Sequence, residues 1–319
     1  MPQTRPPGKR LAPRPSRLRR LLLPLLFLCF CGAAAVAVAA LLRGAPAPEA
    51  AVPAVLPPPS PSTPASPSPT PEPTPEPTPE PTPEPTPEPY DFSVPAPESP
   101  AVEDNYFADA AFIGDSRTDG LRLYSGIQGG TFLSYQGATV FDADKPDKKR
   151  LDLDGTKVGL LEALAARTYG KVYIMLGVNE TGYPNNRAFA QAYGALIDHV
   201  RALQPDAVIY VQSLVPVNPE KCQAYHQPYY VTNEKIQAYT DLLIPLAEEK
   251  RVVYVDVAAA LTGGTGVLPG ELTSDGVHFT RSGYVQWLDY LKTHTVDAAA
   301  YQAGQAATQQ LDEKGTDEI

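Results

Sequence analysis

Residues 111–121 read Ala-Phe-Ile-Gly-Asp-Ser-Arg-Thr-Asp-Gly-Leu, and this segment is the most informative one in the chain. An apolar run ends at Gly114, and Asp115 and Ser116 follow it directly before a segment that predicts a helix. Open α/β sheets bind their ligands where buried strands end, so the Ser116 hydroxyl is predicted to lie at a ligand-binding edge. Taken alone, Ser116 could equally be a helix N-cap residue, because serine is favoured there.

Short apolar runs continue this pattern through the chain. They are rich in β-branched and aromatic residues, as is typical of strands buried on both faces of a sheet. Helical patterns lie between the runs, and one of them places Phe189, Tyr193 and Leu196 on a single face. This alternation predicts a parallel sheet covered by helices on both faces. The predicted strands are residues 110–113, 131–135, 172–176, 208–211 and 252–257.

Four loops that follow predicted strands carry residues suited to chemistry. Ser116, Gly137 and Asn179 follow the first three strands, and Asp275 and His278 come after the fifth. The carboxyl ends of parallel strands meet at one edge of a sheet, so these residues are predicted to converge. His278 would take the proton of the Ser116 hydroxyl, and Asp275 would hold the imidazole tautomer. The Asn179 amide and the backbone N–H groups of Ser116 and Gly137 would then form an oxyanion hole.

Four blocks of sequence around these residues resemble the SGNH, or GDSL-type, hydrolase family of esterases and lipases. The resemblance implies a flavodoxin-like three-layer α/β/α fold with a five-stranded parallel sheet. It also implies Ser116 as nucleophile, His278 as base, Asp275 as its partner, and neither a metal nor another cofactor. The matching blocks, in the family's order, are Gly114-Asp115-Ser116, Gly137, Gly177-Val-Asn179 and Asp275-Gly-Val-His278.

Two positions depart from the usual family pattern, and both bear on the substrate more than on the reaction. Arg117 follows the serine, and Glu180 stands where aspartate is usual. We expect Arg117 either to touch an anionic substrate or to be a surface or ion-paired arginine. Three tyrosines in loops after the third and fourth strands are candidates for substrate binding, because aromatic rings line ligand pockets; local packing is the alternative. They are Tyr183, Tyr229 and Tyr230.

The N-terminal part of the chain predicts export. Residues 1–20 are basic, and residues 21–42 carry no charge and are long enough to span a bilayer. Basic residues before the span favour a single-pass anchor in the cell membrane with the C-terminal domain extracytoplasmic. A cleaved signal peptide and a secreted product is the alternative.

The remaining segments frame one globular domain. Residues 44–103 form a proline-rich linker with Pro-Glu-Pro-Thr repeats, predicted to be disordered and to favour polyproline II. Residues 104–296 form the hydrolase domain, and residues 297–319 are predicted to be a disordered tail. Cys222 is the single cysteine beyond the apolar segment, which excludes an intramolecular disulfide in the exported part.

The net charge of the chain is −10, and its basic residues do not form a patch in the globular part, which excludes nucleic acid as a partner. We therefore expect an extracytoplasmic serine esterase. Its partners would be the membrane, through the N-terminal helix, and a small ester or an acylated glycan, with O-acetyl groups on envelope or extracellular glycans as one option. An acyltransferase or a lipid esterase with the same triad, and a non-catalytic surface binding module on this fold, remain alternatives.

Overall fold

The structure, a computed structural model, has a five-stranded parallel sheet at its centre and describes residues 87–145 and 147–316, with side chains to residue 307. The strand order β2-β1-β5-β6-β7 is that of a flavodoxin-like sheet, so the predicted fold class is confirmed. The strands are β1 (Ala110–Gly114), β2 (Thr131–Ser134), β5 (Lys171–Met175), β6 (Val208–Gln212) and β7 (Val253–Val255).

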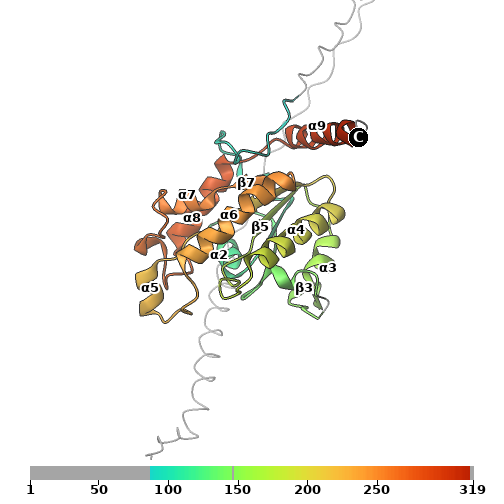
Figure 1. Cartoon of the computed structure of the whole chain (residues 1–319). Coiled ribbons are helices and arrows are strands. Elements are labelled where there is room, and N and C mark those ends of the chain that lie inside the picture. Colours follow the sequence, from blue (N-terminus) through green and yellow to red (C-terminus); the bar gives the residue numbers. More distant parts are fainter. Residues whose placement is uncertain (1–86, 146, 317–319) are drawn as a thin grey trace, which may run out of the picture. The chain divides into compact units, whose positions relative to one another are not determined.

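Helices cover the sheet on both sides, which buries every residue of β1 and β6. On one side α2 (Ser116–Tyr124), α7 (Val257–Thr262) and α8 (Arg281–Thr293) pack together. On the other, α3 (Leu160–Ala165), α4 (Asn186–Leu203) and α6 (Asn233–Glu249) form a second layer, and α4 and α6 cross the near face in Figure 1. Continuous burial explains why the strands read as unbroken apolar runs.

Aromatic rings from neighbouring strands stack at the centre of the sheet. Phe112 on β1 pairs with Tyr173 on β5, which pairs with Tyr210 on β6. Their ring centroids lie 5.0 Å and 4.4 Å apart. Such pairs contribute about 0.5–1.5 kcal/mol each beyond the burial of their area. They therefore help to fix the strand register that brings the carboxyl ends of the strands to one level.

The predicted stripe on α4 is buried as expected. The Asn185 side chain caps the helix by accepting the N–H of Ala188 at 3.1 Å. Phe189, Tyr193 and Leu196 are fully or almost fully buried, and the ring of Phe189 stacks on Tyr239 of α6 with a centroid distance of 3.9 Å. The helix thus begins at a capping residue and is held by its apolar face.

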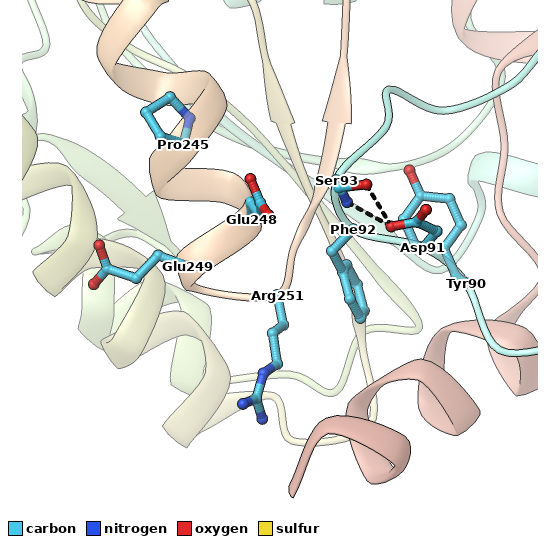
Figure 2. A pocket seen from close by; sticks show the side chains of 8 residues that line it. All are labelled: Tyr90, Asp91, Phe92, Ser93, Pro245, Glu248, Glu249 and Arg251. Atoms are coloured by element: carbon cyan, nitrogen blue, oxygen red, sulfur yellow. Dashed lines mark hydrogen bonds between the residues drawn. The ribbon is translucent and has the colours of Figure 1, made fainter. Parts of the chain in front are cut away.

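The structure corrects both predicted ends of the domain. Residues from Tyr90 onward, predicted to be linker, pack on the domain: the Ala96 N–H donates to the Tyr254 carbonyl at 2.8 Å. Residues predicted to be a disordered tail form the helix α9 (Ala298–Thr316), in which Tyr301 is buried. Figure 2 shows Phe92 near Arg251, which precedes β7, and the Phe92 ring meets Tyr301 of α9 edge-on at 5.5 Å. The domain is therefore longer than residues 104–296.

Smaller elements complete the described part of the chain, among them an antiparallel hairpin of β3 and β4 that the sequence analysis did not predict. None of the described helices is both long and apolar enough to cross a membrane. The predicted span, residues 21–42, lies outside the described residues, as do the basic segment and the Pro-Glu-Pro-Thr repeats up to residue 86. The remaining elements are η1 (Asp104–Phe107), η2 (Val140–Asp142), β3 (Leu151–Leu153), β4 (Thr156–Val158), α5 (Pro219–Ala224) and η3 (Gly270–Leu272).

Candidate active site

Ser116 is presented by a tight turn between β1 and α2. A side chain at Gly114 would place its Cβ 1.9 Å from the Thr118 hydroxyl and 2.9 Å from the Met175 carbonyl, so the turn requires glycine. Asp115 is the N-cap residue of α2, and its carboxylate accepts the Arg117 N–H at 2.8 Å. Ser116 is therefore the first residue of the helix and not its N-cap, which leaves its hydroxyl free for another partner.

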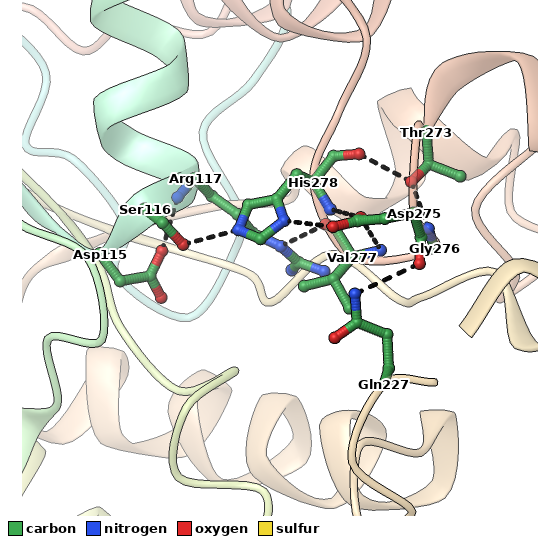
Figure 3. Close-up of polar contacts among 9 residues, drawn as sticks. All are labelled: Asp115, Ser116, Arg117, Gln227, Thr273, Asp275, Gly276, Val277 and His278. Atoms are coloured by element: carbon green, nitrogen blue, oxygen red, sulfur yellow. Dashed lines mark hydrogen bonds and ion pairs between the residues drawn. The ribbon is translucent and has the colours of Figure 1, made fainter. Parts of the chain in front are cut away.

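That partner is His278, which lies 162 positions further along the chain. The Ser116 Oγ and His278 Nε2 atoms are 2.9 Å apart, and His278 Nδ1 lies 2.8 Å from Asp275 Oδ2 (Figure 3). The structure thus brings together the three residues that were predicted to form a triad. Both distances are within ordinary hydrogen-bond range, so a proton can pass from the hydroxyl to the imidazole.

The Asp275 carboxylate folds the loop that carries His278, residues 275–278. Its Oδ1 accepts the backbone N–H groups of Val277 and His278 at 2.9 Å and 2.8 Å, while Oδ2 faces the imidazole. Burial raises the pKa of Asp275, but these hydrogen bonds outweigh burial, and the pKa lies below its usual value. Asp275 is consequently a carboxylate at neutral pH and can orient the ring.

Neighbouring segments hold the 275–278 loop in place. The buried Thr273 hydroxyl donates to the His278 carbonyl at 2.7 Å and accepts the Gly276 N–H at 2.9 Å. Gly276 has a φ of +93°, and a Cβ there would lie 2.5 Å from the Cys222 nitrogen of α5. Gln227 reaches the Asp275 carbonyl through its Nε2 at 3.4 Å, as Figure 3 shows. The loop therefore has little freedom to move the imidazole.

The predicted oxyanion residues lie on the two loops beside Ser116. The Asn179 Nδ2 donates to the Ala138 carbonyl at 2.9 Å and approaches the Asp115 Oδ2 at 3.5 Å. It thereby links the turn after β1 to the loop of Gly137, a glycine with a φ of +75°. A primary amide carries two N–H bonds, and here both face protein oxygens, so Asn179 would donate to a ligand by giving up the longer contact with Asp115.

Glu180 holds the segment that follows Gly137 through a hydrogen bond to its backbone. Its side chain is buried, and Oε1 accepts the Val140 N–H at 2.6 Å, while Oε2 has no hydrogen-bond partner among the described residues. Burial raises the pKa of Glu180 to about 8. The unusual residue in this block thus holds the segment after Gly137 and is neutral at pH 7.

Glu180 makes the stability of the protein depend on pH. The pKa of Glu180 is raised from 4.5 in the unfolded chain to about 8 in the folded protein. The protonated side chain therefore makes its full contribution to stability below pH 4.5, and this contribution is lost as the pH rises toward 8. The measurement is urea unfolding of the wild type and of Glu180→Gln at pH 5 and pH 9. Between these pH values, we expect the free energy of unfolding of the wild type to fall by on the order of 4 kcal/mol more than that of Glu180→Gln. Glu162→Gln, an exposed change on α3, should follow the wild type. Parallel curves for the wild type and Glu180→Gln would contradict the expectation.

Arg117 is buried, which differs from the predicted substrate contact and from the predicted surface position. Its side chain is 1 % exposed, so it is neither a surface arginine nor open to a substrate. The guanidinium instead donates to backbone carbonyls, from Nε to Val277 at 3.0 Å and from Nη1 to Val215 at 2.7 Å. The assignment of Arg117 to substrate binding was therefore wrong.

The predicted tyrosines fall into two groups. Tyr183 and Tyr230 line a cavity of about 340 Å³ together with Asn179, so both lie beside the site. Tyr229 is 92 % exposed and lines a different cavity with Cys222 and His226. A role in substrate binding stays a prediction for the first two, whereas Tyr229 lines a cavity that includes neither Ser116 nor Asn179.

A third cavity, of about 570 Å³, opens on the His278 side of Ser116. Its outer wall includes Leu123 and Tyr124, which are more than half exposed. These residues were not among the predicted site residues, although helical spacing from Ser116 places positions 120, 123 and 124 near one face of α2. The full lining is Ser116, Asp119, Gly120, Leu123, Tyr124, Ser274, Asp275, His278, Phe279, Arg281 and Tyr284. Within residues 87–145 and 147–316, His, Cys, Asp and Glu side chains form no group of three that could hold a metal ion.

A serine, a histidine and an aspartate joined in this way at the carboxyl edge of a flavodoxin-like sheet form the arrangement that serine hydrolases use for nucleophilic attack. Residues 112–286 match the sequence model of the GDSL-like Lipase/Acylhydrolase family, and the chain belongs to this family. The family is one of ester hydrolases, and its model spans all four sequence blocks around the site.

Solved structures of related fold are similar to the chain at low identity, whereas no curated protein matches it. A candidate platelet activating factor from Streptococcus pneumonia is 28 % identical, with 58 % of this chain and 82 % of that one covered and a TM-score of 0.45. A GDSL-like lipase from Bacteroides thetaiotaomicron is 17 % identical, with coverage of 62 % and 88 % and a TM-score of 0.41. An acetyl xylan esterase, AlAXEase, is 16 % identical, with coverage of 59 % and 99 % and a TM-score of 0.42. The family assignment rests on the family match.

Proposed function

We propose that the protein is an extracytoplasmic serine esterase that removes O-acyl groups through an acyl-Ser116 intermediate. One observation carries the proposal: the continuous chain of short contacts from Ser116 Oγ to His278 and from His278 to Asp275, 2.9 Å and 2.8 Å long. A serine hydroxyl is a weak nucleophile until a base takes its proton. His278 is placed to do so, and Asp275 is placed to hold the reactive tautomer.

The reaction would proceed in two steps, acylation of Ser116 and hydrolysis of the acyl-enzyme. Ser116 Oγ attacks the ester carbonyl carbon while His278 Nε2 takes the hydroxyl proton, and the proton then passes to the departing alcohol. A water molecule next attacks the acyl-enzyme with His278 again as base, which releases the acid and restores Ser116. The negative oxygen formed in each step would accept hydrogen bonds from the Ser116 and Gly137 N–H groups and from Asn179.

The shape of the site favours a polar alcohol such as a sugar. Because His278 must protonate the leaving oxygen, the alcohol belongs on the His278 side of Ser116, where the 570 Å³ cavity lies. That cavity offers an aromatic ring, Tyr124, with the charged groups of Asp119 and Arg281 on its walls. An aromatic ring beside charged groups offers a sugar both a stacking surface and hydrogen-bond partners, which supports a sugar as the alcohol.

The N-terminal sequence supports an envelope location. A basic segment, an uncharged span at residues 21–42 and proline-rich repeats would tether the domain outside the cytoplasm, near acylated envelope glycans. We therefore propose O-acyl glycans, with O-acetyl groups as the simplest case, as the substrates.

Labelling of the full chain with a fluorophosphonate tests the proposal. We expect mass spectrometry to find the label on Ser116, since only an activated serine attacks the reagent at a useful rate. The wild type should also hydrolyse p-nitrophenyl acetate, and so should Ser282→Ala, a change at an exposed serine on α8.

Three results would contradict the proposal in different ways. A label on another residue would overturn the nucleophile. Equal rates for the wild type and Ser116→Ala would favour a binding module. Transfer of the acetyl group to added sugar in preference to water would make the protein an acyltransferase with the same triad.

A further inference from the structure

The guanidinium of Arg117 is a cation buried directly beneath the 275–278 loop. Moving a charge from water into a protein costs several kcal/mol unless its partners compensate. Here the partners are the Val277 and Val215 carbonyls, the ring of Phe279 at 5.1 Å from Cζ, and the buried carboxyl of Asp115. A costly burial of this kind, one residue after Ser116, calls for an explanation beyond turn formation.

The contacts of Arg117 enclose His278 on both sides along the chain. Val277 precedes the histidine, and its carbonyl accepts the Arg117 Nε–H at 3.0 Å; Phe279 follows the histidine, and Arg117 Cζ lies over its ring. Arg117 is also covalently joined to Ser116 on α2. The Arg117 side chain thus connects the backbone next to Ser116, which loses the proton, to the backbone next to His278, which accepts it.

Resting on the proposed function, we propose that Arg117 is a positioning residue that sets the distance and angle between Ser116 and His278. Its Nη1 donates to the Val215 carbonyl at 2.7 Å, which anchors the guanidinium to the segment that leaves the sheet after β6. The sheet, α2 and the 275–278 loop are then tied at a single point. Displacement of a reacting group by about 1 Å can cost on the order of 10²-fold in rate.

The role is specific to arginine. The guanidinium is planar and donates in several directions at once, so Nε and Nη1 can serve two carbonyls while the face meets a ring. A lysine ammonium would reach at most part of this set. The charged or titratable groups that influence Arg117 are Asp115, Tyr284, Cys222 and Asp275, and Arg117 Nη2 has no hydrogen-bond partner in the described part of the chain.

The experiment compares Arg117→Met and Arg117→Lys with the wild type in p-nitrophenyl acetate hydrolysis. We expect kcat to fall about 10²-fold in Arg117→Met and about tenfold in Arg117→Lys, with KM within threefold of the wild type. The rate of fluorophosphonate labelling at Ser116 should fall in parallel. The downfield proton resonance of the His278–Asp275 hydrogen bond should shift or broaden in both variants.

Arg201→Met is the matched control. Arg201 on α4 also donates to two backbone carbonyls, those of Lys250 and Arg251, far along the chain from the 275–278 loop. This variant should lose stability and keep kcat and the proton resonance, which separates positioning from general stabilisation.

The outcomes distinguish this proposal from the proposed function. Folded Arg117 variants with wild-type kcat and an unchanged proton resonance would overturn the positioning role and leave the esterase proposal intact. If Arg117→Met fails to fold, Arg117→Lys decides on the same criteria. If the wild type is not labelled by the fluorophosphonate and does not hydrolyse esters, the esterase proposal fails. The positioning role then fails as well only if the proton resonance of the Arg117 variants is the same as that of the wild type.

Discussion

Alanine at either Ser116 or His278 is expected to lower kcat for p-nitrophenyl acetate by about 10⁴- to 10⁶-fold, and the double variant should be no slower than either single one. The reason is the 2.9 Å contact between Ser116 Oγ and His278 Nε2. A hydroxyl without its base, and a base without its hydroxyl, are equally unable to form the acyl-enzyme. The three losses should therefore be similar in size.

Stopped assays of the wild type, the two single variants and the double variant measure this coupling. His294→Ala is a matched histidine control, because His294 stacks on Tyr290 at a centroid distance of 3.7 Å and contacts Thr293, outside the Ser116 cavity. It should keep kcat near the wild-type value. Losses that add up in the double variant would show that Ser116 and His278 act independently, and would contradict a shared proton transfer.

The sheet and the meeting of Ser116 with His278 could be predicted because both follow from local signals. Buried strands such as Ala110–Gly114 are continuous apolar runs, and parallel strands necessarily deliver their carboxyl ends to one edge. The 162-residue separation of Ser116 and His278 is then closed by topology alone. A sequence motif at the end of such a strand consequently carries spatial information.

Arg117 shows where such reasoning ends. Arginine is rarely buried, so a turn with Arg, Thr and Asp reads as solvated. Its burial depends on the carbonyls of Val215 and Val277, which are 98 and 160 positions away. These are backbone groups, which residues of any type would supply at those positions. The same holds for Glu180, whose carboxyl meets the Val140 N–H. Side-chain bonds to distant backbone leave no residue pattern to recognise.

The two ends of the domain were mispredicted for a related reason. Proline-rich and Ala/Gln-rich segments have weak periodicity, and each gains its order from the other: the Tyr90 N–H donates to the Ala300 carbonyl at 2.9 Å, and Phe92 packs on Tyr301. Neither segment buries enough apolar surface alone to predict folding. Their order is a property of the pair and of the edge of the sheet beneath them.

Asparagine at Asp275 is expected to lower kcat by about 10⁴-fold while leaving the fold intact. The carboxylate uses one oxygen for the N–H groups of Val277 and His278 and the other for His278 Nδ1. Asparagine has one oxygen, which the two backbone N–H groups would retain, so its NH₂ group would face the ring. The imidazole must then accept at Nδ1 and carry its proton on Nε2, the tautomer that cannot take the Ser116 proton.

Asp256→Asn is the control for this change. Asp256 caps α7 by accepting the Ala259 N–H at 3.1 Å, so the substitution alters a loop carboxylate of similar local geometry away from the Ser116 cavity. It should cost no more than about 1 kcal/mol of stability and leave kcat unchanged. Since the carboxylate of Asp275 acts in orienting the ring, the loss in Asp275→Asn should appear in kcat with KM nearly constant, and the fluorophosphonate should label Ser116 correspondingly slowly. A kcat within tenfold of the wild type would mean that the 275–278 loop alone fixes the tautomer, and would remove Asp275 from the proposed triad.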